Sequence, residues 1–209
     1  MGKHAQSVDT RLLARIQRHG PGWVFTPADF MDLGSRTAVS TALKRYKASG
    51  TIRWFGRGLY DMPRKHPKLG LLWPEMETLT SAVKRRDSVR LQPTGAYAAN
   101  LLGLSEQVPM QVVFLTDGPE RKIKLGNLKI TFKHTTPRNM ATAGRISGSV
   151  IQALRWLGRR HVDDKVASIL RRKLSARDKQ QLLKDIRHAP VWIAEILHRV
   201  AKPQINNHG

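Results

Sequence analysis

The sequence predicts an α+β fold in two parts, residues 1–67 and 68–209, and three observations predict it. Apolar residues recur at helical spacing over about 7–48, and a short segment of alternating residues follows. A second alternating region covers about 110–134. From about 145 to 201 the pattern is helical again. The second part is therefore expected to be a mixed α/β domain that ends in a helical bundle.

The first two helices are predicted from their apolar spacing and their ends. Apolar residues share one face over about 7–18, and the segment HGPG that follows is typical of a helix end. Thr26 is a favourable N-cap, Pro27 suits the first helical position, and Asp29 lies where a capping-box acid would lie. A second, short helix is therefore predicted over about 27–31.

A third helix is predicted between a cap at Ser35 and a stop at Gly50. One face of this helix is apolar and is expected to be buried: Val39, Ala42, Leu43 and Tyr46. The opposite face is small and polar near its start and basic toward its end: Thr37, Ser40, Thr41, Lys44 and Ala48. Three more cations lie at the margins: Arg36, Arg45 and Lys47.

After the third helix, the segments TIRWF and LYDMP alternate like two strands, and Gly56-Arg57-Gly58 joins them. Glycines permit a tight turn there and allow the backbone to approach a partner closely. A helix, a helix-turn-helix and then a hairpin with a basic tip are together the plan of a winged helix-turn-helix. Residues 1–67 are therefore predicted to bind DNA.

The third helix has the residues that entry into a major groove requires, because short side chains let the backbone approach and polar ones reach base edges. The candidates for base contacts are Arg36, Thr37, Ser40 and Thr41. The candidates for phosphate contacts are Lys44, Arg45, Lys47 and Arg53, with Arg57 at the wing and within reach of the minor groove. The alternative interpretation is that this basic face is simply solvated.

Charge is the dominant bulk property, since Lys and Arg number 37 and Asp and Glu 15, for a formal net charge of +22. The excess is spread along the chain, with 12 basic and 4 acidic residues over 1–67, 11 and 6 over 68–140, and 14 and 5 over 141–209. Such a charge attracts nucleic-acid phosphates through counterion release. It would also suit an anionic membrane or an acidic protein.

An expected linker at 64–75 spans the boundary between the two parts, and it has two prolines and a run of charge. A helix is predicted over about 75–86, a short one over about 94–102, and strands over 110–116 and on both sides of a turn at Gly126. The last strand has a basic face, which is typical of a solvated sheet surface. The apolar stripes of the C-terminal helices are expected to form core, and a protein-binding groove could share them.

The sequence gives little support for an enzyme, a cofactor or a metal site. It has no cysteine, which excludes disulfides and Cys-ligated zinc, and its eight histidines form no His-Glu-x-x-His set. Gly148-Ser149 has the start of a nucleotidyltransferase motif, but the acids that should follow it are absent. No apolar run reaches the ~20 residues that cross a bilayer. A cytoplasmic protein without catalytic residues, cofactor or membrane contact is expected.

The segments GAYAANLLGLS, at 95–105, and VVFLTDGP, at 112–119, follow the winged-helix pattern and precede ITFKHTTPRNM and the helical end. In this order the chain resembles the AbiEi-type antitoxins of bacterial toxin–antitoxin and abortive-infection phage-defence systems. The resemblance implies an antitoxin that neutralises a nucleotidyltransferase-like toxin through its C-terminal region, either by capturing the toxin directly or by acting on the toxin or its target. It also implies a repressor that binds double-stranded DNA, the operator upstream of its own gene, through its N-terminal domain.

Two other functions remain open from the residues. The first is a stand-alone winged-helix transcriptional regulator without a toxin partner, in which the second part only dimerises or adds charge. The second is an RNA-binding module that uses the basic strands, although only 6% of residues are aromatic and stacking platforms are therefore few.

Overall fold

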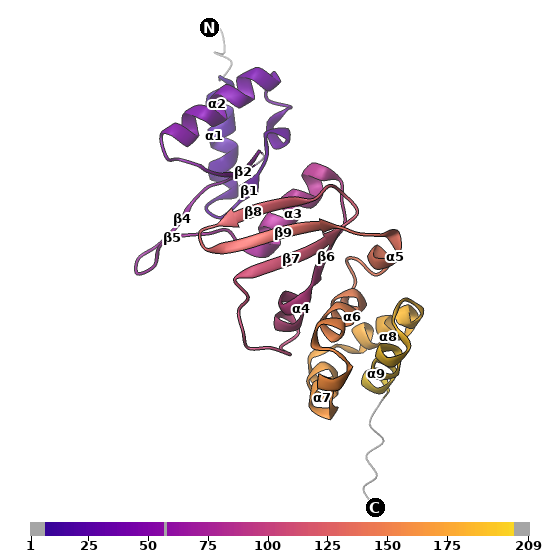
Figure 1. Cartoon of the computed structure of the whole chain (residues 1–209). Helices are drawn as coiled ribbons and strands as arrows, with labels where there is room; N and C mark the ends of the chain where they lie inside the picture. Colours follow the sequence, from indigo (N-terminus) through magenta and orange to yellow (C-terminus); the bar gives the residue numbers. More distant parts are fainter. Residues whose placement is uncertain (1–6, 57, 203–209) are drawn as a thin grey trace, which may run out of the picture. The chain divides into compact units, whose positions relative to one another are not determined.

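The computed structural model of the 209-residue chain describes residues 7–56 and 58–202. It confirms a mixed α+β fold (Figure 1). The chain divides into two compact units, one made of residues 1–88 with 123–126 and the other of 89–122 with 127–209. The first unit thus continues beyond the boundary at 67/68 that the sequence suggested.

The N-terminal part of the first unit alternates helices and short strands. Its elements are α1 (Val8–His19), β1 (Val24–Phe25), the 3-10 helix η1 (Pro27–Phe30), α2 (Arg36–Ala48), β2 (Arg53–Gly56) and β3 (Leu59–Asp61). These elements lie where the sequence predicted helices and a hairpin. The second predicted helix is a single 3-10 turn of four residues, and Phe30 at its end is fully buried.

Capping residues set the helix starts. The hydroxyl oxygen of Ser7 accepts a hydrogen bond from the backbone N–H of Thr10, and that of Ser35 accepts one from the N–H of Ala38. Before η1, the carboxylate of Asp29 accepts a hydrogen bond from the backbone N–H of Thr26 at 2.7 Å. The helices therefore begin at the residues that the sequence indicated.

The three strands pair in the order β1-β3-β2, with both neighbouring pairs antiparallel. The rings of Phe25 and Phe30 pack edge to face with centroids 5.4 Å apart, as expected for apolar residues on both sides of the Thr26 cap. They belong to one core with the apolar faces of α1 and α2: Leu12, Ile16, Leu33, Val39, Ala42, Leu43 and Ile52. This core fixes α2 against the rest of the unit.

The predicted linker at 64–75 is wrong in part, since it contains a second hairpin, β4 (Arg64–His66) and β5 (Gly70–Leu72). Its strands are only three residues long and largely exposed, so no buried alternation marks them in the sequence. The helix α3 (Met76–Asp87) follows, as predicted.

The four-stranded sheet has the strand order β6-β7-β9-β8. Its elements are β6 (Leu91–Thr94), β7 (Gln111–Thr116), β8 (Arg121–Leu125) and β9 (Leu128–His134), with the helix α4 (Gly95–Leu101) between β6 and β7. The strands β7 and β9 run parallel, with Gln111 beside Lys129 and Thr116 beside His134. The carboxyl ends of both strands therefore meet at one edge of the sheet.

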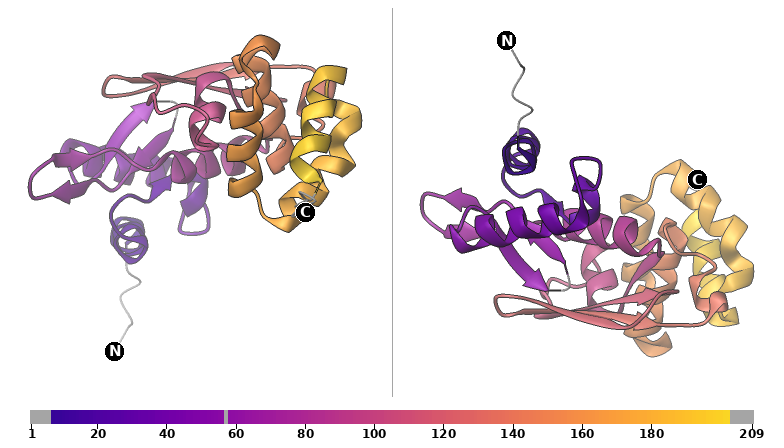
Figure 2. Two further views of the ribbon diagram at one scale, coloured as in Figure 1. Left: turned by 90° about the horizontal axis from the view of Figure 1, so that it is seen from below. Right: turned by 90° about the horizontal axis from the view of Figure 1, so that it is seen from above.

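The chain ends in a cluster of helices, as predicted: α5 (Pro137–Met140), α6 (Ile146–Leu157), η2 (Arg159–His161), α7 (Asp164–Lys173), α8 (Ala176–Asp185), η3 (Ile186–His188) and α9 (Val191–Ala201). Figure 2 shows α6 to α9, in orange to yellow, packed side by side. Their apolar stripes form one core with α4, from Ala98 to Val200. None of the helices within residues 7–56 and 58–202 is long and apolar enough to cross a bilayer.

Candidate nucleic-acid interface

The two faces of α2 have the environments that its sequence predicts. Val39, Ala42 and Leu43 are at most 1% exposed, and Tyr46 is half-buried. The predicted contact residues of the opposite face and its margins are all exposed: Arg36, Thr37, Ser40, Thr41, Lys44, Arg45 and Lys47. The helix thus presents a row of short polar side chains followed by cations.

Contacts with α1 hold α2 in place without covering this face. The phenol of Tyr46 donates a hydrogen bond to the backbone carbonyl of Asp9 at 3.0 Å, and burial raises the pKa of that phenol. Arg45 forms an ion pair with the carboxylate of Asp9, yet its side chain is 67% exposed. The charge of Arg45 is already neutralised by Asp9. Arg45 can therefore bind another anion only if it releases the Asp9 carboxylate.

The loop before α2 is fastened by a second ion pair. The guanidinium of Arg15 binds both carboxylate oxygens of Asp32, at 2.7 and 2.6 Å, and also donates to the backbone carbonyl of Asp29. Hydrogen bonding to Arg15 lowers the pKa of Asp32. Because Asp32 is paired in this way, its negative charge does less to repel an anion near the start of α2.

Trp54 extends this surface and was not among the residues predicted from the sequence. Its indole is 49% exposed on β2, and the ammonium of Lys47 lies 4.8 Å from the ring centroid. The neighbouring Phe55 and Leu59 are buried, so the strand has apolar anchors without Trp54. The alternation in TIRWF, which puts Trp54 opposite to Phe55, is the signal that could have identified it.

Arg53 has an internal position, which removes it from the predicted phosphate contacts. Its guanidinium binds both carboxylate oxygens of Asp61, at 3.0 and 2.6 Å, and donates to the carbonyl of Leu72 at 2.6 Å. It also lies 4.5 Å from the ring centroid of Trp73. Asp61 is fully buried, so Arg53 neutralises a charge inside the protein and joins β2 to the end of β5.

Arg57, the predicted wing contact, lies outside the described residues. On either side of it, Gly56 and Gly58 have φ values of 125° and 70°, which an L side chain rarely adopts. Both glycines therefore adopt backbone conformations that glycine permits, as the sequence predicted on the two sides of the hairpin tip.

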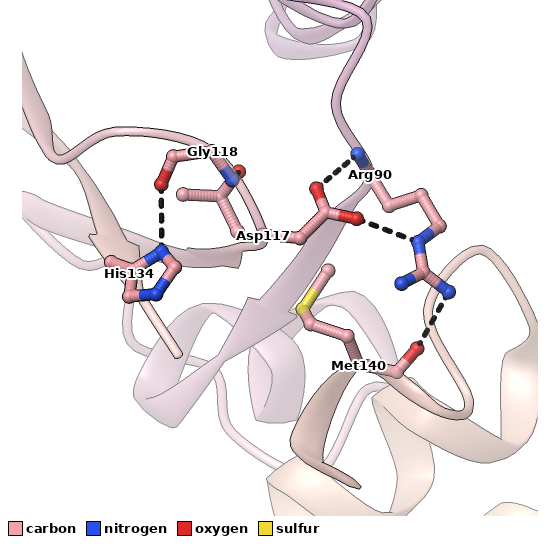
Figure 3. A network of polar contacts seen from close by, with 6 residues as sticks. Arg90, Asp117, Gly118, His134 and Met140 are labelled. Atoms are coloured by element: carbon pink, nitrogen blue, oxygen red, sulfur yellow. Dashed lines mark hydrogen bonds and ion pairs between the residues drawn. The ribbon is translucent and has the colours of Figure 1, made fainter. Parts of the chain in front are cut away.

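A second cluster of polar groups lies where β7 and β9 end, in the second unit (Figure 3). The carboxylate of Asp117 accepts hydrogen bonds from the backbone N–H and the Nε of Arg90, both at 2.8 Å. Arg90 also donates to the carbonyl of Met140 at 3.4 Å. The ring Nδ1 of His134 lies 2.9 Å from the carbonyl oxygen of Gly118. Each oxygen of the Asp117 carboxylate thus has one donor from Arg90.

The pKa of Asp117 agrees with a structural role. Partial burial alone would raise this pKa, but the hydrogen bonds from Arg90 outweigh burial and hold it below its usual value. The adjacent Gly118 is required for packing, since a Cβ there would overlap the side chain of Val89. Among the described residues, no group of three or more His, Asp or Glu side chains could hold a metal ion.

The Gly148-Ser149 pair also has a structural explanation. Gly148 lies in α6, where a Cβ would collide with the side chain of Gln92 on β6 and the carbonyl of Thr142. Ser149 accepts a hydrogen bond from the amide of Gln92 at 3.3 Å. Both residues therefore let α6 approach the sheet closely.

Comparisons with known proteins add a family and a fold. A family model described as "Family of unknown function (DUF6088)" matches residues 11–182. Curated proteins gave no match. Among solved structures, the crystal structure of the RV2827C protein from Mycobacterium tuberculosis is similar, with a TM-score of 0.50 and 14% sequence identity over 97% of this chain and 80% of that one. At this identity the likeness concerns the fold alone.

Proposed function

Since the chain belongs to the DUF6088 family, whose function is unknown, we propose its role from its own residues: a DNA-binding repressor that is also the antitoxin of a bacterial toxin–antitoxin pair. The observation that carries the proposal is the exposed face of α2. It offers short polar groups for base edges and cations for phosphates, and the apolar groups beneath it are buried.

The arrangement of elements around α2 supports a winged helix-turn-helix. The chain runs α1, β1, η1, α2, β2, β3, and the strand order β1-β3-β2 puts the β2–β3 connection at the end of a hairpin that follows the helix. In this proposal α2 is the recognition helix and the turn around residue 57 is the wing. RNA binding is supported less well, because the major groove of an RNA helix is too deep and narrow for a protein helix to read. A face that is only solvated would not require short polar side chains followed by cations along one helix.

The charges around α2 favour an anionic partner. The first turn of α2 contains no acidic residue, and its last turn contains Arg45 and Lys47. In a helix-turn-helix complex the N-terminal part of the recognition helix contacts base edges. We therefore assign base contacts to Arg36, Thr37, Ser40 and Thr41, and phosphate contacts to Lys44 and Lys47, with Arg45 contributing when it exchanges Asp9 for a phosphate.

Trp54 belongs to the same proposed surface. Its indole N–H is a donor that suits a phosphate oxygen, and Lys47 over the ring adds a positive charge beside it. A half-exposed indole next to the recognition helix would bury its apolar area against the sugar-phosphate backbone. The proposal thus gives a function to Trp54, an exposed side chain that the buried core does not require for its packing.

The antitoxin part of the proposal rests on the resemblance of the second half of the chain to AbiEi-type proteins. The toxin would be the nucleotidyltransferase-like product of a neighbouring gene, and both proteins would act in the cytoplasm. In the structure the second of the two most specific segments contains Asp117, whose carboxylate pairs with Arg90.

Two measurements with the full chain test the proposal. Footprinting on DNA upstream of its own gene should give a protected, repeated sequence. Co-expression with the adjacent gene should remove that gene's toxicity, including when Thr37→Asp and Thr41→Asp abolish the footprint. If neither the footprint nor the protection is seen, the proposed function is wrong.

A further inference from the structure

A groove between the C-terminal helices of the second unit has a basic rim. It has a volume of about 570 Å³, and the cations Arg171, Arg172, Lys179 and Lys202 line it. None of the described residues that line it is acidic. Four positive charges on one concave surface repel one another, so the groove gains stability when an anionic group enters it.

The groove also has an aliphatic lining. Ala176, Leu183 and Ala201 contribute to it, and Leu183 on α8 is 44% exposed. No aromatic side chain is among the described residues of the lining. Nucleic-acid bases are usually held by stacking on aromatic rings, whereas aliphatic side chains between cations fit a helix with both Leu and Glu side chains.

The walls of the groove are held by defined contacts. The guanidinium of Arg171 on α7 donates to the backbone carbonyl of Arg199 on α9, at 3.3 Å from Nε and 3.0 Å from a terminal nitrogen. Arg199 in turn forms an ion pair with Asp164 at the start of α7. Because α7 and α9 are joined at two points, the groove does not have to be ordered by its ligand.

We propose that this groove binds an acidic, amphipathic helical segment of a protein partner. Carboxylates on the partner would pair with Arg172, Lys179 and Lys202, and an aliphatic side chain would contact Leu183. This inference rests on the proposed antitoxin role, which makes the toxin the natural source of such a segment. It assigns the neutralising surface to α7, α8 and α9.

The test uses a fluorescein-labelled peptide of about 18 residues, five helical turns, with Leu at positions i, i+3, i+4 and i+7, four Glu beside this stripe, and Ala or Gln elsewhere so that the peptide can form a helix. Fluorescence anisotropy with the full chain should give saturable binding. The variant Arg172→Glu/Lys179→Glu should weaken it by about tenfold or more. Leu183→Ser should weaken it by about threefold, and a peptide with Ser in place of Leu should be insensitive to that change.

The matched control is Lys129→Glu/Lys133→Glu, which reverses two exposed cations on β9 of the same unit. This control variant should change the affinity for the peptide by less than about twofold, because it changes the net charge of the chain and leaves the groove intact. Equal losses in groove and control variants would overturn the proposal. It would also be overturned if the groove variant lost binding of an RNA of about 20 nucleotides and kept binding of the peptide.

The same variants separate this inference from the repressor role. Operator affinity should be unchanged in Arg172→Glu/Lys179→Glu, because α2 is not altered. If the wild-type chain binds no operator, the repressor proposal fails while the peptide measurement still decides the groove. If the full chain does not bind the peptide, the groove proposal fails. The footprint on the operator would still test the repressor proposal.

Discussion

The ammonium of Lys47 on α2 lies 4.8 Å from the ring centroid of Trp54 on β2. This contact joins the end of the proposed recognition helix to the strand that leads into the proposed wing. Both side chains are exposed, so the pair contributes only about 0.5–1 kcal/mol to folding. Its larger effect is expected in the complex with DNA, where both groups would lose water together.

Replacing Trp54 with Ala should therefore weaken operator binding by about 1–2 kcal/mol, because the indole donor and its apolar contact are both lost. Trp54→Phe should recover part of the affinity by restoring the ring alone. Fluorescence anisotropy with a labelled operator duplex measures both. Trp156→Ala is the matched control, since that indole is 46% exposed and belongs to the second unit. Equal losses for Trp54→Ala and Trp156→Ala would contradict the assignment.

Arg53→Ala should act on stability, because it leaves the fully buried carboxylate of Asp61 without its partner. Removing one member of a buried ion pair costs about 3–5 kcal/mol, and urea unfolding would measure the loss. Arg36→Ala, at an exposed position of α2, should change the free energy of unfolding by less than about 0.5 kcal/mol. An Arg53→Ala protein as stable as the wild type would refute the internal role.

Lys44 and Thr41 should differ in the way they affect DNA binding. Lys44→Ala should weaken all duplexes alike and reduce the slope of log affinity against log salt by about 1. Thr41→Ala should leave that slope unchanged and relax specificity at one base pair, at a cost of about 1–3 kcal/mol on the operator. Titrations at several salt concentrations, on operator and scrambled duplexes, distinguish the two patterns. Identical effects of both variants would show that α2 does not read bases.

Asp117 should make stability depend on pH in the acid range. Its pKa is lowered in the folded chain, so its stabilising contribution is complete above the unfolded pKa of about 3.9 and is lost as pH falls through the folded value. Asp117→Asn should cost about 1 kcal/mol at pH 7, since the pair is partly exposed, and little at pH 2. Thermal unfolding at several pH values tests this, and a pH-independent difference would exclude the ion pair as its cause.

Most of the helices and strands could be predicted because local chemistry defines them. Ser35 caps α2, and the apolar spacing of Val39, Ala42 and Leu43 defines its buried face. The hairpin at 64–72 could not be predicted, because its strands are short and exposed and carry no alternation of buried residues.

Side-chain partners were less predictable than elements. Arg53 and Arg36 are both arginines in a basic segment, but only the structure reveals that Arg53 binds Asp61, a residue eight positions away across a hairpin. The contact of Lys47 with Trp54 likewise depends on how β2 packs beside α2. A sequence pattern identifies a face of one element, whereas these contacts depend on tertiary packing.

The central claim is that the exposed face of α2 binds DNA in a sequence-specific way. The most direct measurement is the affinity of the full chain and of Thr37→Asp/Thr41→Asp for the duplex upstream of its own gene and for a scrambled duplex. We expect the wild type to prefer the first duplex by at least about 1,000-fold and the variant to lose this preference while remaining folded. Equal affinity of the wild type for both duplexes, or an unchanged preference in the variant, would contradict it.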